Sequence, residues 1–324
     1  MRILKFIGSF FLVLIFGVGL FYFWAKSATL PGSTYAKVIV KDPQNTQKRD
    51  TVFSIVTYNI GYLSGMTNNL PRDKPKELFD KNLQLVLKET KKLNPDVMAF
   101  QEIDYNSNRS YAVNQQNEIA KLGFNYTAEA INWDKTYVPF PYWPIKMHFG
   151  KVVSGQSVLS KFPIKKHQRV VLHRVKEAPF YRDAFYLERL AQVVEVTIND
   201  KAVIIINVHL ESFDAKTRAI QFDEVCAIFD TYKKSYPTIL LGDFNSEARN
   251  KSALIQKLFN RQDVGNAAFN SEAILNTFNS ATPFKRIDYI FYTKNSIDYL
   301  SGSVLTQFGE ASDHLPIEMK FRLK

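Results

Sequence analysis

Short strand-forming segments that end in polar side chains constrain the fold of this chain more than any other feature. They are rich in β-branched and aromatic residues, and turn-forming residues separate them. In chain order they are FSIVTYN, DVMAFQE, SGQSVLSK, AQVVEVTI, AVIIINVHL, TILLGDFN, RIDYIFYT and LPIEMKFRL. Helical periodicity appears between them, at residues 76–93, 114–122, 215–234 and 251–261. The pattern predicts an α/β fold in which strands outnumber helices.

Polar side chains that bind metals or transfer protons gather where these strands end. They are Asn59, Glu102, His209, Asp243, Asn245, Asp288, Asp313 and His314. Taken singly, an Asp or Asn after a strand is more often a turn former, and a lone His is more often structural. We expect the set to act together, because a reacting site needs its groups held by rigid elements such as sheets. Most of the set offers only oxygen ligands, which suit Mg²⁺ or Mn²⁺ better than zinc.

In this order the motifs resemble those of the endonuclease/exonuclease/phosphatase superfamily, which includes pancreatic deoxyribonuclease and neutral sphingomyelinases. The motifs are VTYNIG, AFQEID, INVHLES, LLGDFNS, RIDYIF and SDHLPI. The resemblance spans residues 52–323, and GDFN and SDH are its strongest pieces. It implies a four-layer α/β/β/α sandwich of two mixed β-sheets flanked by helices, in one catalytic domain over residues 51–324. It also implies a hydrolase of phosphoric esters that depends on a divalent metal ion.

The resemblance assigns the metal to three residues. Glu102 is expected to be the principal ligand, with Asn59 and Asp313 beside it or at a second site. The expected ion is Mg²⁺, or Mn²⁺ in its place. Mg²⁺ is usually bound by one or two carboxylates together with phosphate and water, so this short ligand set suits it.

The remaining motif residues are expected to handle protons and charge. The resemblance places Asp288 against His314, where a carboxylate fixes the imidazole's tautomer and stabilises its protonated form. His314 and Asp243 are both candidates for the general base. Asn245 is expected to orient the nucleophile, and His209 to donate to a phosphate oxygen.

Residues 6–24 form an unbroken apolar run behind a basic flank at residues 1–5. The run has about 19 residues, or roughly 28 Å as a helix, which is close to the thickness of a bilayer's hydrocarbon core. Tyr22 to Trp24 supply aromatic rings where a membrane interface would lie. We predict an uncleaved transmembrane helix. A cleaved signal peptide is the main alternative, but the run is long and Lys26 interrupts the small-residue site behind it.

Residues 25–50 mix Pro, Gly, Asn, Gln and charged residues and are predicted to be a linker, with a short strand at AKVIV. We expect a single-pass membrane protein whose catalytic domain lies outside the cytoplasm, or a secreted domain if the segment is cleaved. Cys226 is the only cysteine, so neither an intrachain disulfide nor a cysteine zinc cluster can form.

The net charge of +11 favours polyanionic partners. The expected substrate is a phosphodiester or phosphomonoester, whether a phospholipid head group, a nucleic acid or an inositol phosphate. The predicted membrane helix favours a lipid head group, whereas the charge suits an extracytoplasmic nuclease equally well. A catalytically inactive module that binds phosphate or polyanions is the alternative from another class, and the complete set of motif residues argues against it. No obligate protein partner is inferred.

Residues 136–155 are dense in aromatic residues and proline. We expect the loop with Tyr142 and Trp143 to enter a lipid interface, or else its aromatic residues to cap the sheet edge or pack beneath the site. The strand behind it resembles one that borders the active site in the superfamily. The candidate substrate contacts are Trp143, His148, Lys151 and Ser154. Arg189 and Gln192 are weaker candidates.

Overall fold

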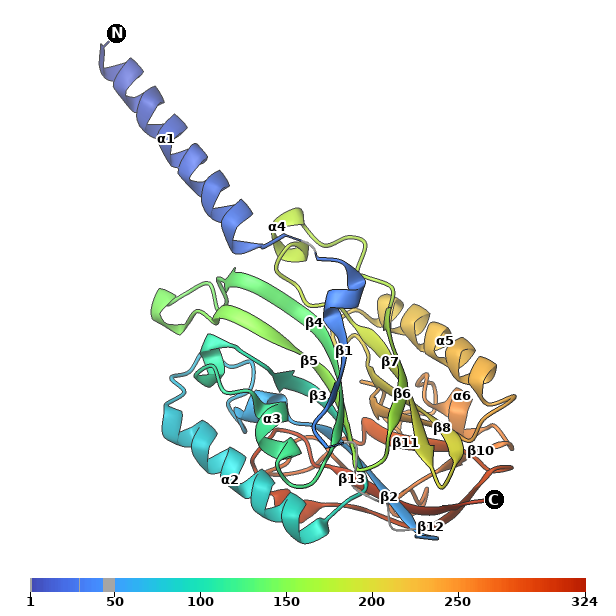
Figure 1. The fold of residues 1–324 in the computed structure, drawn as a ribbon. Coiled ribbons are helices and arrows are strands. Elements are labelled where there is room, and N and C mark those ends of the chain that lie inside the picture. Colours follow the sequence, from blue (N-terminus) through green and yellow to red (C-terminus); the bar gives the residue numbers. More distant parts are fainter. Residues whose placement is uncertain (1, 29, 43–49) are drawn as a thin grey trace.

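Two β-sheets form the centre of the molecule (Figure 1). The structure is a computed structural model, and it describes residues 2–28, 30–42 and 50–324. Parts of the predicted basic flank and linker, residue 1 and residues 29 and 43–49, lie outside the described residues. Each sheet holds one parallel pair of strands, and its remaining pairs are antiparallel. Both sheets are therefore mixed, as predicted.

The seven-stranded sheet has the order β1 (Ala36–Val40), β4 (Tyr126–Val138), β5 (Gly150–Ser160), β3 (Val97–Asp104), β2 (Phe53–Asn59), β13 (Ile317–Leu323) and β12 (Ile297–Val304). The six-stranded sheet has the order β10 (Val264–Asn266), β11 (Asp288–Thr293), β9 (Thr238–Asp243), β8 (Lys201–His209), β7 (Leu190–Ile198) and β6 (Ile164–Val171). The described helices are α1 (Arg2–Ala25), α2 (Lys76–Leu93), α3 (Gln115–Ala120), α4 (Phe180–Asp183), α5 (Ala215–Tyr232) and α6 (Gln256–Phe259). Short 3₁₀-helices lie at Gly32–Tyr35, Gly61–Leu63, Asn108–Ser110, Ile145–Met147 and Thr306–Phe308.

The two sheets pack face to face, and helices cover their outer faces. Alternate residues of β8 show why, since Val203 and Ile205 lie in the core between the sheets while Ile204 and Ile206 lie beneath α5. Because side chains alternate along a strand, a strand buried on both faces reads as a continuous apolar run. Helices α2 and α3 cover the seven-stranded sheet in the same way (Figure 1). This is the four-layer sandwich that the resemblance implied, and the fold prediction is confirmed.

Helix α1 leaves the sandwich and projects away from it (Figure 1). It has 24 residues, and none of its most apolar stretch is buried against the rest of the chain. By length and composition it could cross a membrane, and a signal sequence would have the same features. Behind it, β1 pairs with β4, so this part of the segment interpreted as a linker is a strand of the sheet.

Strand directions bring the polar strand ends together. The parallel strands β2 and β3 carry Asn59 and Glu102 at their carboxyl ends, and the parallel strands β8 and β9 carry His209 and Asp243. Asp288 begins β11 directly opposite Asp243, and the SDH motif precedes β13, which runs antiparallel to β2. All of these positions therefore lie at one end of the sandwich.

Candidate active site

Asp288 and His314 form a buried, hydrogen-bonded pair. The Nδ1 atom of His314 lies 2.9 Å from the Oδ2 atom of Asp288. The same carboxylate oxygen accepts a second hydrogen bond, of 2.6 Å, from the hydroxyl of Thr277, which fixes its orientation. The ring of Phe278 packs against the imidazole, with ring centroids 5.1 Å apart. The remaining ring nitrogen of His314, Nε2, lies 3.9 Å from the Oδ2 atom of Asp243.

The protonation of this pair is set by burial and by neighbouring carboxylates. Burial disfavours the imidazolium, but the carboxylates of Asp288, Asp243 and Asp313 outweigh burial and raise the pKa of His314 well above its ordinary value. Burial, with the Asp288 charge, raises the pKa of Asp243 to about 7, although His314 opposes the shift. Asp243 therefore titrates near neutral pH beside a protonated imidazole, which suits a proton acceptor.

Asp243 is also held by amide groups. Its Oδ2 atom accepts from the side chain of Asn59 at 3.1 Å, and its Oδ1 atom accepts from the backbone N–H of Asn245 at 2.9 Å. Asn245 has a φ of 48°, a left-handed conformation that Asn tolerates better than most residues. Its side-chain amide donates to the carbonyl of Leu210 at 3.0 Å. The GDFN segment is thus a strand end whose tight turn fixes the carboxylate.

Glu102 and Asp313 face a single amide. The Nδ2 atom of Asn68 donates to the Oε2 atom of Glu102 at 2.9 Å and to the Oδ1 atom of Asp313 at 3.2 Å. Burial, and next the Asp313 charge, raise the pKa of Glu102. Glu102 lies at an irregularity of the β3–β5 pairing and has a φ of 53°. A left-handed backbone at a charged residue stores strain, which is common where a side chain is directed into a site.

Gly61 allows Asp313 to come this close. A Cβ atom at Gly61 would lie 2.8 Å from the Oδ1 atom of Asp313 and 2.8 Å from the hydroxyl of Ser312. The φ angle of Gly61 is 53°. The backbone N–H of Gly61 donates to the Oδ1 atom of Asn59 at 3.1 Å. The side chain of Asn59 therefore connects this turn to Asp243 in the other sheet.

His209 lies between the two groups of carboxylates. Its Nε2 atom is 3.7 Å from the Oε1 atom of Glu102 and 3.6 Å from the Oδ2 atom of Asp243. Burial, together with the positive charges of Arg189 and His314, holds the pKa of His209 well below its ordinary value. A neutral imidazole here can donate one hydrogen bond, whereas the imidazolium of His314 carries a full charge.

Two sets of residues have the donor atoms that a metal ion needs. Glu102 and Asp313 form the first. Asp243, Asp288 and His314 form the second, and one potential ligand atom from each of these lies within 4.8 Å of the others. In the second set His314 already uses Nδ1 to bind Asp288, and its raised pKa favours the imidazolium. Positive charge there disfavours a cation, so the first set is the better candidate.

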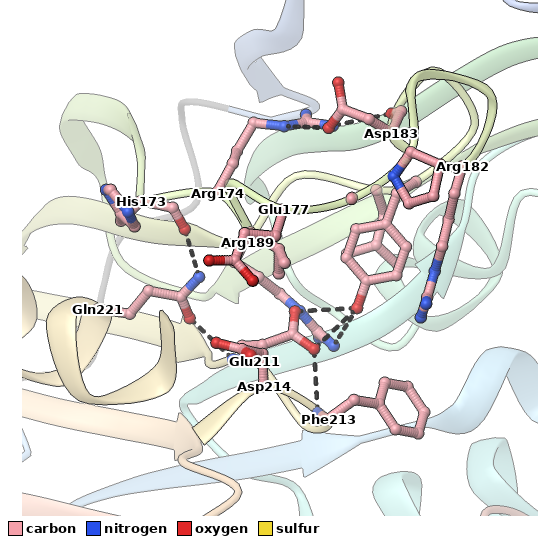
Figure 2. Close-up of a pocket in the computed structure, with 15 residues that line it drawn as sticks. His173, Arg174, Glu177, Arg182, Asp183, Arg189, Glu211, Phe213, Asp214 and Gln221 are labelled. Carbon is pink, nitrogen blue, oxygen red and sulfur yellow. Dashed lines mark hydrogen bonds and ion pairs between the residues drawn. The ribbon is translucent and has the colours of Figure 1, made fainter. Parts of the chain in front are cut away.

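A cavity of about 580 Å³ adjoins Glu102 and is lined mainly by aromatic side chains. Its lining includes Tyr62, Trp133, Phe140, Tyr142, Phe149, Tyr181, Phe185, Arg189 and Phe213. Arg189 is buried and lies 3.4 Å from the carboxylate of Glu211, which it faces in a second, neighbouring pocket (Figure 2). One terminal nitrogen of Arg189, Nη1, has no hydrogen-bond partner among the described residues. Nη1 is enclosed by protein atoms, so Arg189 is a candidate for attracting an anionic group to the cavity through its charge.

The structure does not bring the four predicted substrate contacts to this cavity. Trp143 and Lys151 are exposed, and the Nδ1 atom of His148 is 2.8 Å from the hydroxyl of Tyr137. Ser154 is fully buried because strand alternation turns it inward, where its hydroxyl accepts from Arg109 at 3.3 Å. Neighbours on the same hairpin, including Phe140 and Phe149, line the cavity instead.

Of the two weaker candidates, Arg189 lines the cavity and Gln192 does not. The side-chain amide of Gln192 donates to the carbonyl of Ala128 and its oxygen accepts from Asn207, so it belongs to a buried network between the sheets. Asn68 was not predicted as a site residue, because nothing in the sequence distinguishes it from the other residues of a polar turn. Lys74 was also missed. Burial, and next the charge of Arg109, lower its pKa to about 8, while Asp313 opposes the shift.

Comparisons with known proteins agree with this architecture. Residues 56–314 match the Endonuclease/Exonuclease/phosphatase family. No curated protein matches the chain. Among solved structures, the chain is similar to an endonuclease/exonuclease/phosphatase from Beutenbergia cavernae DSM 12333, with 21% identity over 85% of this chain and 72% of that chain and a TM-score of 0.60.

It is also similar to the catalytic domain of human Nocturnin with bound sulfate, at 18% identity over 91% of this chain and 100% of that chain, with a TM-score of 0.57. Truncated TDP2 from Caenorhabditis elegans is a third similar structure, at 18% identity over 84% of this chain and 97% of that chain, with a TM-score of 0.52. At these identities the likeness concerns the fold. The family match covers most of the sequence, and the chain belongs to the endonuclease/exonuclease/phosphatase family, whose members are generally hydrolases of phosphoric esters.

Proposed function

We propose that this chain hydrolyses a phosphoric ester with the help of a divalent cation, Mg²⁺ or Mn²⁺. One observation carries the proposal. Two carboxylates, Glu102 and Asp313, face a single neutral amide within hydrogen-bonding distance, directly beside the Asp288–His314 pair. A neutral amide compensates the negative charge of two carboxylates poorly. Carboxylate oxygens are the ligands that a hard divalent cation prefers.

Glu102 and Asp313 would hold the cation, and Asn59 would support it from the next strand. The raised pKa of Glu102, caused by burial and by Asp313, supports this assignment because a cation would relieve the same repulsion. When bound, the cation would neutralise negative charge on a nonbridging phosphate oxygen. Asn68 would then release the two carboxylates.

The other residues would stabilise charge and move one proton. Phosphoryl transfer asks a protein mainly to position groups and to neutralise spreading negative charge. The pKa of Asp243, raised to about 7 by burial and Asp288, favours Asp243 as the acceptor of the proton from attacking water. The imidazolium of His314, held by Asp288, is then the electrostatic partner. Neutral His209 would donate to a phosphate oxygen, and the positive charge of Arg189, which lines the cavity, would help to attract the phosphate.

The N-terminal helix favours a membrane lipid as the substrate. We propose that α1 is an uncleaved single-pass anchor and that the catalytic domain lies outside the cytoplasm. An ester of a phospholipid head group then lies within reach of the site. An extracytoplasmic nuclease is the alternative, favoured by the net charge of +11. An inactive module that binds polyanions is disfavoured, because the full set of proton-handling and oxygen-donor residues is present at one end of the sandwich.

Metal removal tests this proposal. We expect the full chain in detergent to hydrolyse bis(p-nitrophenyl) phosphate or p-nitrophenyl phosphate, to lose activity in EDTA, and to regain it with Mg²⁺ or Mn²⁺. Comparison of the two substrates distinguishes a diesterase from a monoesterase. Full activity in EDTA would rule out the metal, and saturable binding of supercoiled DNA or anionic vesicles without turnover of any ester would favour the inactive module.

A further inference from the structure

The last turn of α1 is packed against the active-site end of the sandwich. Phe21 and Trp24 lie against Tyr137 at the end of β4, with ring centroids 5.7 and 6.0 Å apart. Tyr22 lies against Phe180 and Phe185, at 5.8 and 5.9 Å. The helix therefore joins the domain through direct contacts and not through a free tether.

Polar contacts fix the same junction. The ammonium group of Lys135 donates to the carbonyl of Lys26 at 3.1 Å, and the backbone N–H of Thr136 donates to the hydroxyl of Ser27 at 2.6 Å. All of these partners lie within three residues of the end of the helix or of β4. The orientation of the domain relative to the helix axis is thus held by both aromatic and polar contacts.

The length of α1 leaves no room for a stalk. The apolar run of α1, residues 6–24, is about 28 Å long as a helix, and the hydrocarbon core of a bilayer is about 30 Å thick. Nearly all of this run is needed to cross, so residues 21–26 at its end would lie at the interface, where aromatic rings and Lys are favoured. The surface of the domain that touches these residues must then rest at the membrane.

That surface contains the mouth of the cavity beside Glu102. Aromatic side chains that line the cavity remain exposed, with Tyr142 65% and Phe213 80% accessible. Trp143 and Phe180, next to lining residues, are 77% and 73% accessible. Figure 1 shows α4, which carries Phe180, beside the end of α1. Soluble surfaces rarely expose so many neighbouring aromatic rings without a partner.

We propose that this aromatic rim (Phe140, Tyr142, Trp143, Phe180, Tyr181 and Phe213) docks on the lipid bilayer and that the cavity receives the apolar part of a membrane-resident phosphoester. The inference rests on the proposed function, since the phosphate must reach Glu102, which lines the inner part of the same cavity. Arg182 lines the cavity too and Lys146 is exposed near the rim, so both can meet anionic head groups. A nucleic acid would need a basic groove, whereas this lining is mainly apolar.

A series of p-nitrophenyl alkyl phosphates tests the apolar cavity. The probes are the methyl, butyl and octyl esters, used below their critical micelle concentrations on the full chain in detergent-free nanodiscs of phosphatidylcholine. Burial of one methylene corresponds to about fourfold in affinity, so KM should fall by at least about 30-fold from methyl to octyl even if burial is partial. Tyr142→Ser with Phe213→Ser should reduce this KM ratio by about 10-fold or more. Leu300→Ser, on β12 at the opposite edge of the sheet, should keep the ratio.

Bilayer contact is measured separately. The emission of Trp143, obtained as the difference between the wild type and Trp143→Phe, should lose at least about half its intensity in nanodiscs that contain brominated phosphatidylcholine. Unquenched Trp143 emission, or a KM that does not depend on chain length while the methyl ester is turned over, would overturn the inference and leave the proposed function standing. Failure to hydrolyse any ester would overturn the proposed function, and the quenching would still report whether the rim docks.

Discussion

Asp288 differs from the other carboxylates of the site because it is hydrogen-bonded to the imidazole of His314. Its Oδ2 atom accepts from His314 and from Thr277, so the residue positions the imidazole and raises its pKa. The carboxylates of Glu102 and Asp313, in contrast, face an amide that belongs to neither strand. Under the proposed function, the Asp288–His314 pair would supply a positively charged imidazole, and Glu102 and Asp313 would bind the metal ion.

The Asp288–His314 pair predicts a non-additive mutant cycle. Asp288→Ala and His314→Ala should each lower kcat by at least about 10²-fold, and the double variant should be little worse, because residues that act as a unit are not additive. Asp288→Asn keeps the shape but removes the charge that raises the pKa of His314. The basic limb of its pH–rate profile should therefore move to lower pH. Additive losses and an unmoved basic limb would show that the two residues work separately.

His167 predicts a pH dependence of stability that is independent of the site. Burial lowers its pKa from 6.5 to about 4, so the unfolded chain takes up this proton more readily than the folded chain. The free energy of unfolding should fall as the pH falls from about 6.5 to 4. At 1.36 kcal/mol per pKa unit the loss is up to about 3 kcal/mol, and His167 should cause no further loss below pH 4. Urea unfolding of wild type and His167→Gln at pH 7 and pH 4.5 measures the difference. An equal pH dependence in both proteins would contradict the assignment.

Single residues were predictable from the sequence where a strand end fixed them. His209 and Asp243 follow apolar runs that can only be central strands, and parallel pairing then brings them level. Asn68 was not predictable, because its place depends on how the turn after β2 folds over Glu102. Lys151 and Ser154 do not line the cavity for a similar reason, since one residue of register decides which face of β5 a side chain occupies. Trp143 and His148 lie in the loop before β5, whose packing the sequence does not determine.

Strand β4 shows the same limit at the scale of elements. Its sequence, YTAEAINWDKTYV, contains Ala, Glu, Asn and Lys, which favour strands weakly, so no strand was predicted there. It forms because β1 and β5 pair with it on both sides.

The helix expected over residues 251–261 is shorter in the structure and covers only Gln256–Phe259. Asn250 explains part of this difference. Its side-chain oxygen accepts from the backbone and hydroxyl of Ser252, a local turn that competes with a helix. By contrast, Lys76–Leu93 begins and ends where its periodicity predicted.

Gly242 makes the close pairing of β8 and β9 possible. Its φ is 134°, and a Cβ atom there would lie 2.0 Å from the carbonyl oxygen of Val208. We expect Gly242→Ala to lower the free energy of unfolding by at least about 3 kcal/mol. Gly123→Ala is the matched control, since its φ is 102° but no atom lies within 4 Å of the added Cβ. Gly123→Ala should lower the free energy of unfolding only through backbone strain, by about 1–2 kcal/mol. Denaturant titrations that give equal losses for the two variants would contradict the packing argument.

Helix α1 predicts how the protein fractionates. If it is an uncleaved anchor, the mature chain should remain in the membrane pellet after a carbonate wash at high pH, because 24 residues of apolar helix cannot be extracted by charge. Removal of residues 2–28 should release the protein to the supernatant. Amino-terminal sequencing of the mature protein provides the decisive reading, and a start near Ala28 would identify a cleaved signal peptide.

At the scale of the whole molecule, function depends on which elements share one end of the sandwich. Residues from both sheets meet at that end, and α1 and the rim lie there too. Local patterns predicted most of the strands and the residues at their ends, and the resemblance to the superfamily implied the sandwich. It could not predict the cavity or its position beside α1, because these depend on how distant loops pack.

The proposed role of Glu102 is to hold a catalytic divalent cation, and one variant tests this role most directly. Manganese binding measured by electron paramagnetic resonance, together with kcat on bis(p-nitrophenyl) phosphate, should be compared for the wild type, Glu102→Gln and Glu129→Gln. Glu129 is the matched control, a buried glutamate on β4 whose pKa is likewise raised by burial but which lies outside the site. We predict that Glu102→Gln weakens Mn²⁺ binding by at least about 10-fold and lowers kcat by at least about 10²-fold, while Glu129→Gln changes neither. Wild-type Mn²⁺ affinity and kcat in Glu102→Gln would contradict the account.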